Sequence, residues 1–332
     1  MIRRSAPLAV TVAAVALSAC GGGGDADLTI YSGRNEELVG DLIARFERES
    51  DLKVDVRYGD SAELAATIAE EGKNSPADVF FSQDAGALGA VEDTLSPVPR
   101  PVLDAVPDRF RDPRGRWAGL SGRARVIAYN TDELDENEVP DSVFDLTEER
   151  WRGRVGIPPP NASFQAFISA MRLEVGEDRT RKWLEDMRDN EAQLYDNNIQ
   201  TVEAIGRGEI DVGLVNHYYL YELKREDPDL AVANHFPRRG DPGSLVNAAG
   251  VGILESTDGR ENAERFARFL VSEAAQEYFA ERTFEYPLVE GVQPPAGLPA
   301  LDGLTGPQVE LGRLGGQLRS TLKLLDAVGF TT

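Results

Sequence analysis

Residues 28–82 contain the pattern that decides the fold: LTIYSGRNEELVGDLIARFERESDLKVDVRYGDSAELAATIAEEGKNSPADVFFS. Three short apolar segments, at 28–31, 53–58 and 77–81, are predicted strands. Between the first two, apolar residues recur three and four positions apart, which predicts an amphipathic helix over 36–50. Strands that alternate with helices favour a parallel sheet covered by helices, so we expect a right-handed βαβαβ unit here.

A second unit of this kind follows further along the chain. We predict a long strand over 123–130, a short strand over 155–157 and another strand over 211–215. The segment 247–254, rich in Ala, Gly and Val, is expected to return to the first unit as a strand. A closing helix is predicted over 317–328. The chain is therefore expected to form two similar lobes.

No stretch of linker composition separates these two lobes. The chain is instead expected to cross between them more than once, which makes a hinge of strands rather than two tandem domains. We assign residues 27–127 plus 249–295 to the N-terminal lobe and residues 128–248 plus 296–332 to the C-terminal lobe. The predicted fold class is α/β, with two lobes and a hinge crossed by strands.

The composition indicates a folded protein with an acidic surface. The chain has 332 residues, with 35 Lys and Arg against 57 Asp and Glu, and its formal net charge is −22. Its hydrophobic content of 41% argues against a wholly disordered chain. Negative charge of this size repels phosphate backbones, so binding of nucleic acid through a basic face is not expected.

Residues 1–20 form a predicted export signal. Two arginines precede an apolar stretch at 8–17, which is shorter than the roughly 20 residues that a membrane span needs. The signal ends in Leu-Ser-Ala-Cys, which resembles the bacterial lipobox, and Cys20 is the only cysteine of the chain. Residues 21–26 follow as a glycine-rich tether. We expect an exported lipoprotein, held by acyl chains on Cys20 at the outer face of the cytoplasmic membrane, in the periplasm or at the cell surface.

Four turns after predicted strands contain candidate binding residues, at 32–35, 82–84, 158–163 and 216–219. In open α/β sheets, ligands bind beyond the carboxyl ends of the strands, so these turns are expected to line a cleft. The sequence contains no nucleophile elbow, phosphate-binding P-loop, dinucleotide fingerprint or zinc-type spacing of Cys and His. We therefore do not expect an enzyme.

The adjacent residues Tyr218 and Tyr219 are the most informative of these candidates. Neighbouring side chains on a helix diverge by about 100°, so both rings cannot easily be core, and one or both should face a cleft. A bound cation of high charge can displace the phenol proton at neutral pH, and ferric iron is the physiological cation that suits this exchange. The alternative is that these rings and Tyr221 pack together or stack on an organic ligand.

Two further features suit a bound anion. Asn161 and Ser163 are candidate caps of a helix, and the exposed amides of a helix start bind anions. Arg123 and Arg125 alternate along a predicted strand, so they face one side and could hold an anion. An ordinary capped helix and a structural salt bridge are the alternatives. His217 is either a ligand or a structural residue.

Six segments together resemble the bacterial periplasmic ferric-iron-binding proteins that serve ABC importers. The resemblance extends over nearly the whole mature chain and is carried by LTIYSG (28–33), SPADVFFS (75–82), LSGRARV (120–126), NHYYLY (216–221), DPGSLV (241–246) and EYPL (285–288). It implies a two-lobe periplasmic-binding-protein fold of type II, whose lobes close on the ligand like a hinge.

The resemblance also implies roles for individual residues. Tyr218 and Tyr219 match the pair that coordinates ferric iron in the family. A synergistic anion, which is carbonate, phosphate or another anion, is implied near Asn161, Ala162, Ser163, Arg123, Asn198 and Asn216. Asn35 and Gln83 stand where many members have a His and a Glu ligand, and they are implied to line the facing lobe.

These two neutral residues change the charge balance of the implied site. Fe³⁺ with two tyrosinates keeps one positive charge, and Asn35 and Gln83 supply only neutral oxygens. A divalent anion, or a carboxylate such as Glu36 or Asp84, would offset that charge. We therefore expect a more open, anion-dependent site than in members with His and Glu ligands.

The sequence thus predicts a monomeric receptor that captures ferric iron and delivers it to the permease of an ABC importer. The receptor would touch the membrane only through its lipid anchor. The transport ATPase would supply the energy for import, so this chain needs no catalytic activity of its own. The alternative is a receptor of the same fold for a small organic ligand, such as a polyamine, a thiamine-like compound or a phosphonate.

Overall fold

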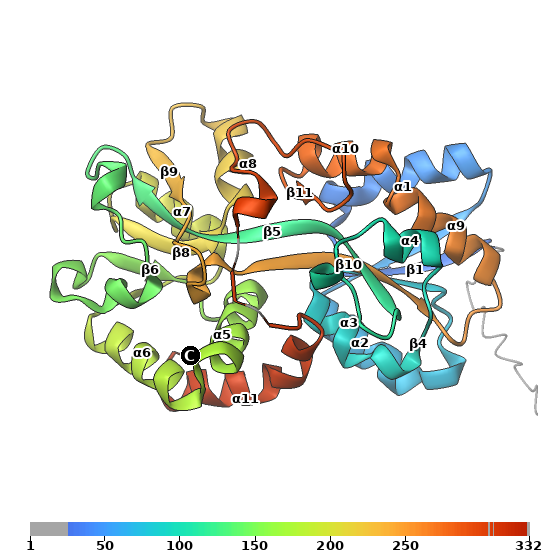
Figure 1. The fold of residues 1–332 in the computed structure, drawn as a ribbon, viewed down its shortest axis with the longest axis horizontal. Helices are drawn as coiled ribbons and strands as arrows, with labels where there is room; N and C mark the ends of the chain where they lie inside the picture. The colour runs from blue at the N-terminus through green and yellow to red at the C-terminus, as the bar shows by residue number, and fades with distance from the viewer. Residues whose placement is uncertain (1–25, 305, 308, 331–332) are drawn as a thin grey trace, which may run out of the picture.

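The computed structural model describes residues 26–304, 306–307 and 309–330. The predicted export signal with Cys20, and all but the last residue of the predicted tether, lie outside these described residues. Two α/β bodies stand side by side (Figure 1), and the strands β5 (Trp117–Asn130) and β10 (Val246–Leu254) run from one to the other. The prediction of an α/β fold is confirmed.

The described strands form one mixed sheet in the order β2-β1-β3-β10-β5-β8-β6-β7, with β4 on β10 and with β9 and β11 on β5. Besides β5 and β10, these strands are β1 (Leu28–Ser32), β2 (Val54–Tyr58), β3 (Val79–Ser82), β4 (Leu95–Ser96), β6 (Val155–Ile157), β7 (Gln193–Leu194), β8 (Val212–Asn216), β9 (Val232–His235) and β11 (Tyr286–Pro287). Because β1 pairs in parallel with both β2 and β3, the predicted parallel β-α-β-α-β arrangement is confirmed.

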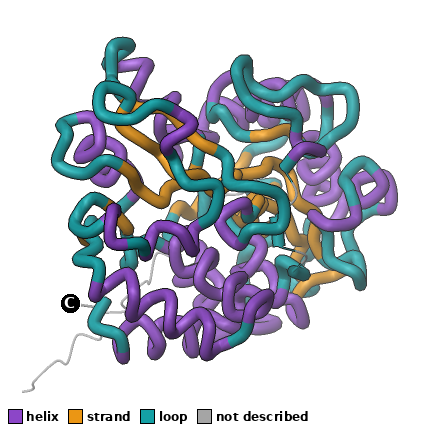
Figure 2. Tube along the Cα trace, turned by 60° about the vertical axis from the view of Figure 1, so that its left-hand side comes forward, coloured by secondary structure: helices purple, strands orange, loops and turns teal. Residues whose placement is uncertain are grey.

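Helices cover both faces of this sheet, as Figures 1 and 2 show. The described α-helices are α1 (Glu36–Ser50), α2 (Ser61–Glu71), α3 (Ala85–Ala90), α4 (Arg100–Asp104), α5 (Ala162–Val175), α6 (Glu177–Asp189), α7 (Asn198–Gly206), α8 (Tyr218–Glu226), α9 (Arg260–Leu270), α10 (Glu273–Arg282) and α11 (Arg313–Ala327). Local signals start and end them: the Asp60 carboxylate accepts a hydrogen bond from the Ala62 amide at 2.7 Å to begin α2, and Gly72, at φ 54°, ends it.

The long strand β5 belongs to both bodies. Ala124 pairs with Val246 of β10 in the first body, whereas the next residue, Arg125, pairs with Asn216 of β8 in the second. The sequence predicted this strand only from residue 123, but it begins at Trp117, because its earlier half is also buried between helices. The change of partner after Ala124 marks the crossing between the bodies.

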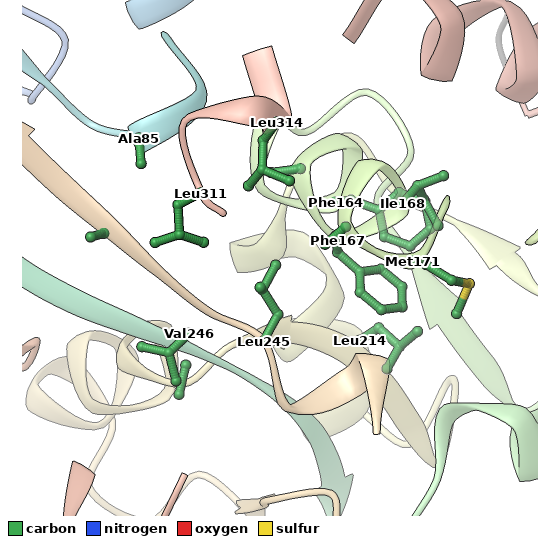
Figure 3. Packing of buried hydrophobic residues seen from close by; sticks show 14 of the residues in the cluster. Ala85, Phe164, Phe167, Ile168, Met171, Leu214, Leu245, Val246, Leu311 and Leu314 are labelled. Atoms are coloured by element: carbon green, nitrogen blue, oxygen red, sulfur yellow. The ribbon is translucent and has the colours of Figure 1, made fainter. Parts of the chain in front are cut away.

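The closing helix α11 joins the two bodies on one side of the sheet. It packs against α3 in the first body and against α5 in the second. In the close-up of this core, Leu311 and Leu314 lie between Ala85 and the aromatic cluster of Phe164 and Phe167 (Figure 3). Burial of these side chains stabilises both bodies against one shared helix.

Helices α3 and α11 approach so closely that their backbones touch. A Cβ atom on Gly89 would lie 1.9 Å from the backbone oxygen of Gly312, and a Cβ atom on Gly315 would lie 1.9 Å from that of Gly86. The sequence predicted this helix over 317–328, but it begins four residues earlier, because the glycines that weaken a helix are needed here for close packing.

Gly89→Ala is therefore expected to lower the free energy of unfolding by about 1–3 kcal/mol or more, because the methyl group would overlap the backbone of Gly312. Gly316→Ala in the same helix pair is the matched control, since a Cβ there meets nothing within 4 Å. We expect the control to raise the free energy of unfolding by up to about 1 kcal/mol. Urea unfolding of both variants measures the two effects, and equal effects would contradict the proposed backbone contact.

Candidate functional site

The tyrosine pair lies where the chain crosses between the two bodies. Tyr218 and Tyr219 begin α8, directly after β8 and His217, and β8 pairs with the second half of β5. The two rings stack, with centroids 4.2 Å apart and an interplanar angle of 30°. Tyr218 is buried and Tyr219 is half-buried. The pair thus lies next to the crossing between the two bodies, since the His217 amide donates to the Ala124 carbonyl oxygen at 2.9 Å.

Burial keeps the Tyr218 phenol protonated in the absence of a cation. Burial raises the pKa of Tyr218 well above its ordinary value, and the proximity of Tyr219 adds to this effect, although Arg123 opposes it. A cation of high charge would therefore have to displace this proton on binding. Within the described residues, no group of three or more His, Cys, Asp or Glu side chains is placed so that it could hold a metal ion.

His217 is structural rather than a ligand. Its Nδ1 accepts a hydrogen bond from the Ala124 amide at 3.1 Å, so Nε2 carries the proton and donates it to the Phe284 carbonyl oxygen at 2.8 Å. Complete burial lowers the pKa of His217 to about 4, although the hydrogen bond to Phe284 opposes this shift. Both ring nitrogens are occupied, so the open question from the sequence is decided in favour of the structural role.

A buried ion pair lies beside the tyrosines. Arg34, from the turn after β1, makes two hydrogen bonds to Glu285, at 2.7 and 2.8 Å, and both side chains are fully buried. Arg123 lies 3.9 Å from the same carboxylate and also donates to the Gln83 carbonyl oxygen. The desolvation of Glu285 would raise its pKa, but the charge and hydrogen bonds of Arg34 outweigh it, so the pKa lies below the ordinary value.

Most of the predicted anion-binding residues come together at the start of α5. The Asn161 side-chain oxygen accepts from the Ser163 amide at 3.0 Å and from Asn198 Nδ2 at 3.0 Å. The Asn198 side-chain oxygen accepts from the Asn216 amide at 3.3 Å. Ala162 is exposed at the first position of the helix. The polar side chains come from the cap and first turn of α5, from the first residue of α7 and from the last residue of β8, and they make a polar patch beside a helix N-terminus.

Arg125, rather than Arg123, reaches this polar patch. Its guanidinium donates to Ser163 Oγ at 3.2 Å and to the Leu214 carbonyl oxygen at 2.7 Å, while Asn216 Oδ1 lies at 3.5 Å. The side chain is completely buried, and this desolvation lowers its pKa to about 9. Among the described residues, no carboxylate forms an ion pair with it, and its Nε has no hydrogen-bond partner. The guanidinium also lies over the rings of Phe164 and Phe167, with its carbon 5.5 and 5.3 Å from their centroids, so neutral groups and aromatic faces surround this buried cation.

The cleft-lining candidates lie on the turns of the first body. Asn35 is exposed immediately before α1, and Gln83 is half-buried after β3, with its side-chain oxygen enclosed and without a hydrogen-bond partner in the described part of the chain. Asp84 is already used, because its carboxylate accepts from the Ala87 amide at 3.1 Å and from Asn247 at 3.2 Å. Asp84 is therefore the N-cap of α3, and its two hydrogen-bond donors are neutral groups.

Sequence reasoning assigned no role to Arg34 or Glu285, although Arg34 lies in the candidate turn 32–35 and Glu285 lies in the EYPL segment of the family resemblance. Arg34 follows the end of β1 by two residues and Glu285 directly precedes β11, so each charge stands next to a buried strand, where a charged side chain needs a partner. Their pairing joins positions 251 residues apart in the sequence, which no local pattern reveals.

These side chains gather where the chain crosses between two lobes, as ligand-binding residues do in solute receptors of two lobes. A family model for a bacterial extracellular solute-binding protein matches residues 74–304, and the chain belongs to this family, whose members are extracytoplasmic receptors rather than enzymes. None of the helices in the described part of the chain has the length and apolar character to span a membrane.

Several relatives of this chain have names that refer to the uptake or binding of iron. Iron uptake protein A1 of Synechocystis sp. is 32% identical over 97% of this chain and 95% of its own length. The Fe(3+)-binding periplasmic protein of Serratia marcescens is 30% identical over 87% of each chain. The solved structure of iron-bound HitA from Pseudomonas aeruginosa has a TM-score of 0.85 and 31% identity, and covers 91% of this chain and 99% of its own.

A Trichodesmium protein solved in complex with iron and citrate has a TM-score of 0.82 and 31% identity, and the match covers 92% of this chain and 99% of that one. The resemblance to ferric-iron-binding proteins and the two-lobe fold of type II are thereby confirmed.

Proposed function

We propose that this protein captures ferric iron together with a small anion outside the cytoplasm and delivers it to the permease of an ABC importer. The observation that carries the proposal is the stacked pair Tyr218 and Tyr219 at the crossing of the lobes, beside buried arginines. In this proposal the two phenolates are the iron ligands, and Asn35 and Gln83 line the facing lobe. The relatives named after ferric iron support the same ligand.

The buried charges favour an anion with at least two negative charges. Glu285 can neutralise only one of Arg34, Arg123 and Arg125, which leaves two positive charges. Fe³⁺ with two tyrosinates adds one more. Carbonate, phosphate or a polycarboxylate held by Arg125 and the polar patch of Asn161, Ser163, Asn198 and Asn216 would reduce this excess. The Trichodesmium protein solved with iron and citrate supports an anion of this kind.

The test is a titration of the metal-free chain, without residues 1–20, with a ferric chelate in carbonate, phosphate, citrate or no added anion. We expect the visible charge-transfer band of tyrosinate bound to iron, and we expect it to develop fully only when an anion is present. An equally strong band without an anion would contradict the anion dependence. No band under any of these conditions would contradict the ferric assignment and would favour a small organic ligand in the same cleft.

The lobe boundaries belong to this proposal as well. We propose that residues 27–127 plus 249–295 and residues 128–248 plus 296–332 close on the ligand about β5 and β10, and that the receptor works as a monomer. The partner change of β5 after Ala124 supports a hinge at this point. The packing of α11 against both α3 and α5 supports a motion in which the lobes stay joined on that side.

The lipid anchor gives a separate prediction. We propose that acylation of Cys20 holds the receptor at the membrane, so Cys20→Ala is expected to move the protein from the membrane fraction to the soluble extracytoplasmic fraction. Fractionation followed by immunoblotting measures this change. Ser18→Ala, which keeps the cysteine, is the matched control and should stay with the membrane. A Cys20→Ala protein that remains membrane-bound would contradict the anchor.

A further inference from the structure

The segment 283–286, which we call the linking segment, runs from the end of α10 to the first residue of β11 and contains one residue in an uncommon backbone conformation. Phe284 has φ 56°, in the left-handed region that bulky residues seldom adopt. Such a conformation costs free energy and persists only where the surroundings hold it. Here the Phe284 carbonyl oxygen accepts from His217, and its ring lies 5.6 Å from that of Tyr221 and nearly parallel to it.

The linking segment is thereby fixed to the element that carries the tyrosine pair. His217 directly precedes Tyr218, and its two ring nitrogens are bonded to Phe284 of the linking segment and to Ala124 of β5. The His217 ring also packs against Tyr286, with centroids 5.0 Å apart. The position of α8 relative to the hinge strand therefore depends on the linking segment.

Glu285 fixes the same segment to the first body. Its carboxylate receives two hydrogen bonds from Arg34, at 2.7 and 2.8 Å, one from Ser121 Oγ at 2.7 Å and one from Thr283 Oγ1 at 3.2 Å. Arg34 is the neighbour of Asn35 in the turn after β1. Arg123, 3.9 Å from Glu285, also holds the backbone of Gln83. The turn of Asn35 and the turn of Gln83 are thus both connected to the Glu285 carboxylate, the first through Arg34 and the second through Arg123.

We propose that Glu285 is a positioning residue for iron capture, which sets the cleft turns of Asn35 and Gln83 against the tyrosine pair through the linking segment. Glu285 itself touches neither iron nor anion. The inference rests on the proposed function, because it takes Tyr218 and Tyr219 as the iron ligands. A carboxylate that orients both sides of a cleft would control how long the closed, iron-bound state lasts.

The test compares Glu285→Gln with wild type in the rate at which iron passes to an excess of a strong synthetic chelator. We expect the release rate to rise about 10- to 100-fold, the range that applies to residues supporting metal ligands. We expect the charge-transfer band to remain, because both phenolates are still present. Adding Arg34→Met should raise the rate little further, since the two residues act as one pair. Glu49→Gln breaks the exposed Arg45–Glu49 pair and should leave the rate unchanged.

The rate of iron release distinguishes a positioning role of Glu285 from a merely structural role. A Glu285→Gln protein with a lower unfolding temperature but an unchanged release rate, measured well below both transitions, would show a merely structural role and overturn it. If this variant does not fold, Ser121→Ala removes a single hydrogen bond from the same carboxylate. It should raise the release rate about fivefold, and an unchanged rate would again overturn the proposal. Absence of the band in wild type would instead overturn the proposed function itself.

Discussion

Joint replacement of Tyr218 and Tyr219 by Phe is expected to abolish the charge-transfer band and to lower the affinity for ferric iron by more than about 100-fold. Even residues that only support metal ligands are worth about 10- to 100-fold, and these two would be the ligands themselves. The rings remain, so the stacking at 4.2 Å is kept. The free energy of unfolding of the metal-free protein should change by no more than about 1 kcal/mol, the net worth of a hydrogen bond.

Tyr58→Phe is the matched control for this experiment. Tyr58 is half-buried on β2, at the outer end of the sheet order, so its hydroxyl lies on a strand remote from the crossing of the lobes. Competition with a chelator of known affinity, followed by the visible band, measures all variants. Iron affinity that survives in the double variant would refute the tyrosinate site, whatever the anion.

Arg125→Met is expected to have two opposite effects. The metal-free protein should become more stable by about 1–4 kcal/mol, because replacing buried ionic groups by apolar side chains of similar volume removes their desolvation cost. Arg125 is completely buried, and its described partners are the neutral groups of Leu214, Ser163 and Asn216 together with the rings of Phe164 and Phe167, against which the Met side chain would still pack. Iron affinity in carbonate should fall about 10- to 100-fold, because the anion loses its buried cation.

Urea unfolding of the metal-free protein and iron titrations with and without carbonate measure the two effects. Arg45→Met, at an exposed position on α1, is the control and should change the free energy of unfolding by less than about 1 kcal/mol. If Arg125→Met destabilised the metal-free protein and left the anion dependence intact, Arg125 would be an ordinary structural residue and the anion would have to bind elsewhere.

The sequence predicted the elements of the fold more accurately than their ends. Apolar periodicity located α1 and the first three strands, because a helix or strand with one buried face has apolar residues at regular spacing in the sequence. It placed the starts of β5 and α11 too late. Trp117 lies in a strand and Gly315 in a helix because both pack against segments that are distant in the sequence. A local sequence pattern does not reveal such neighbours.

The candidate site shows the same division. The sequence pointed to Tyr218, Tyr219, Asn161 and Ser163, because these residues follow predicted strands or begin helices, where ligands bind, and the family resemblance added Asn198. Tertiary structure decided the rest. It engaged both nitrogens of His217, brought Arg125 to the polar patch and enclosed Arg34 with Glu285.

The amino-acid sequence by itself determined the α/β fold class and the place of a tyrosine pair after a strand, since periodicity and short motifs are local properties, and the receptor class followed from the family resemblance. Only the tertiary structure decided which charges meet. Arg34 and Glu285 are 251 positions apart, and the balance between desolvation and pairing that governs buried charges exists only once folding has brought such residues together.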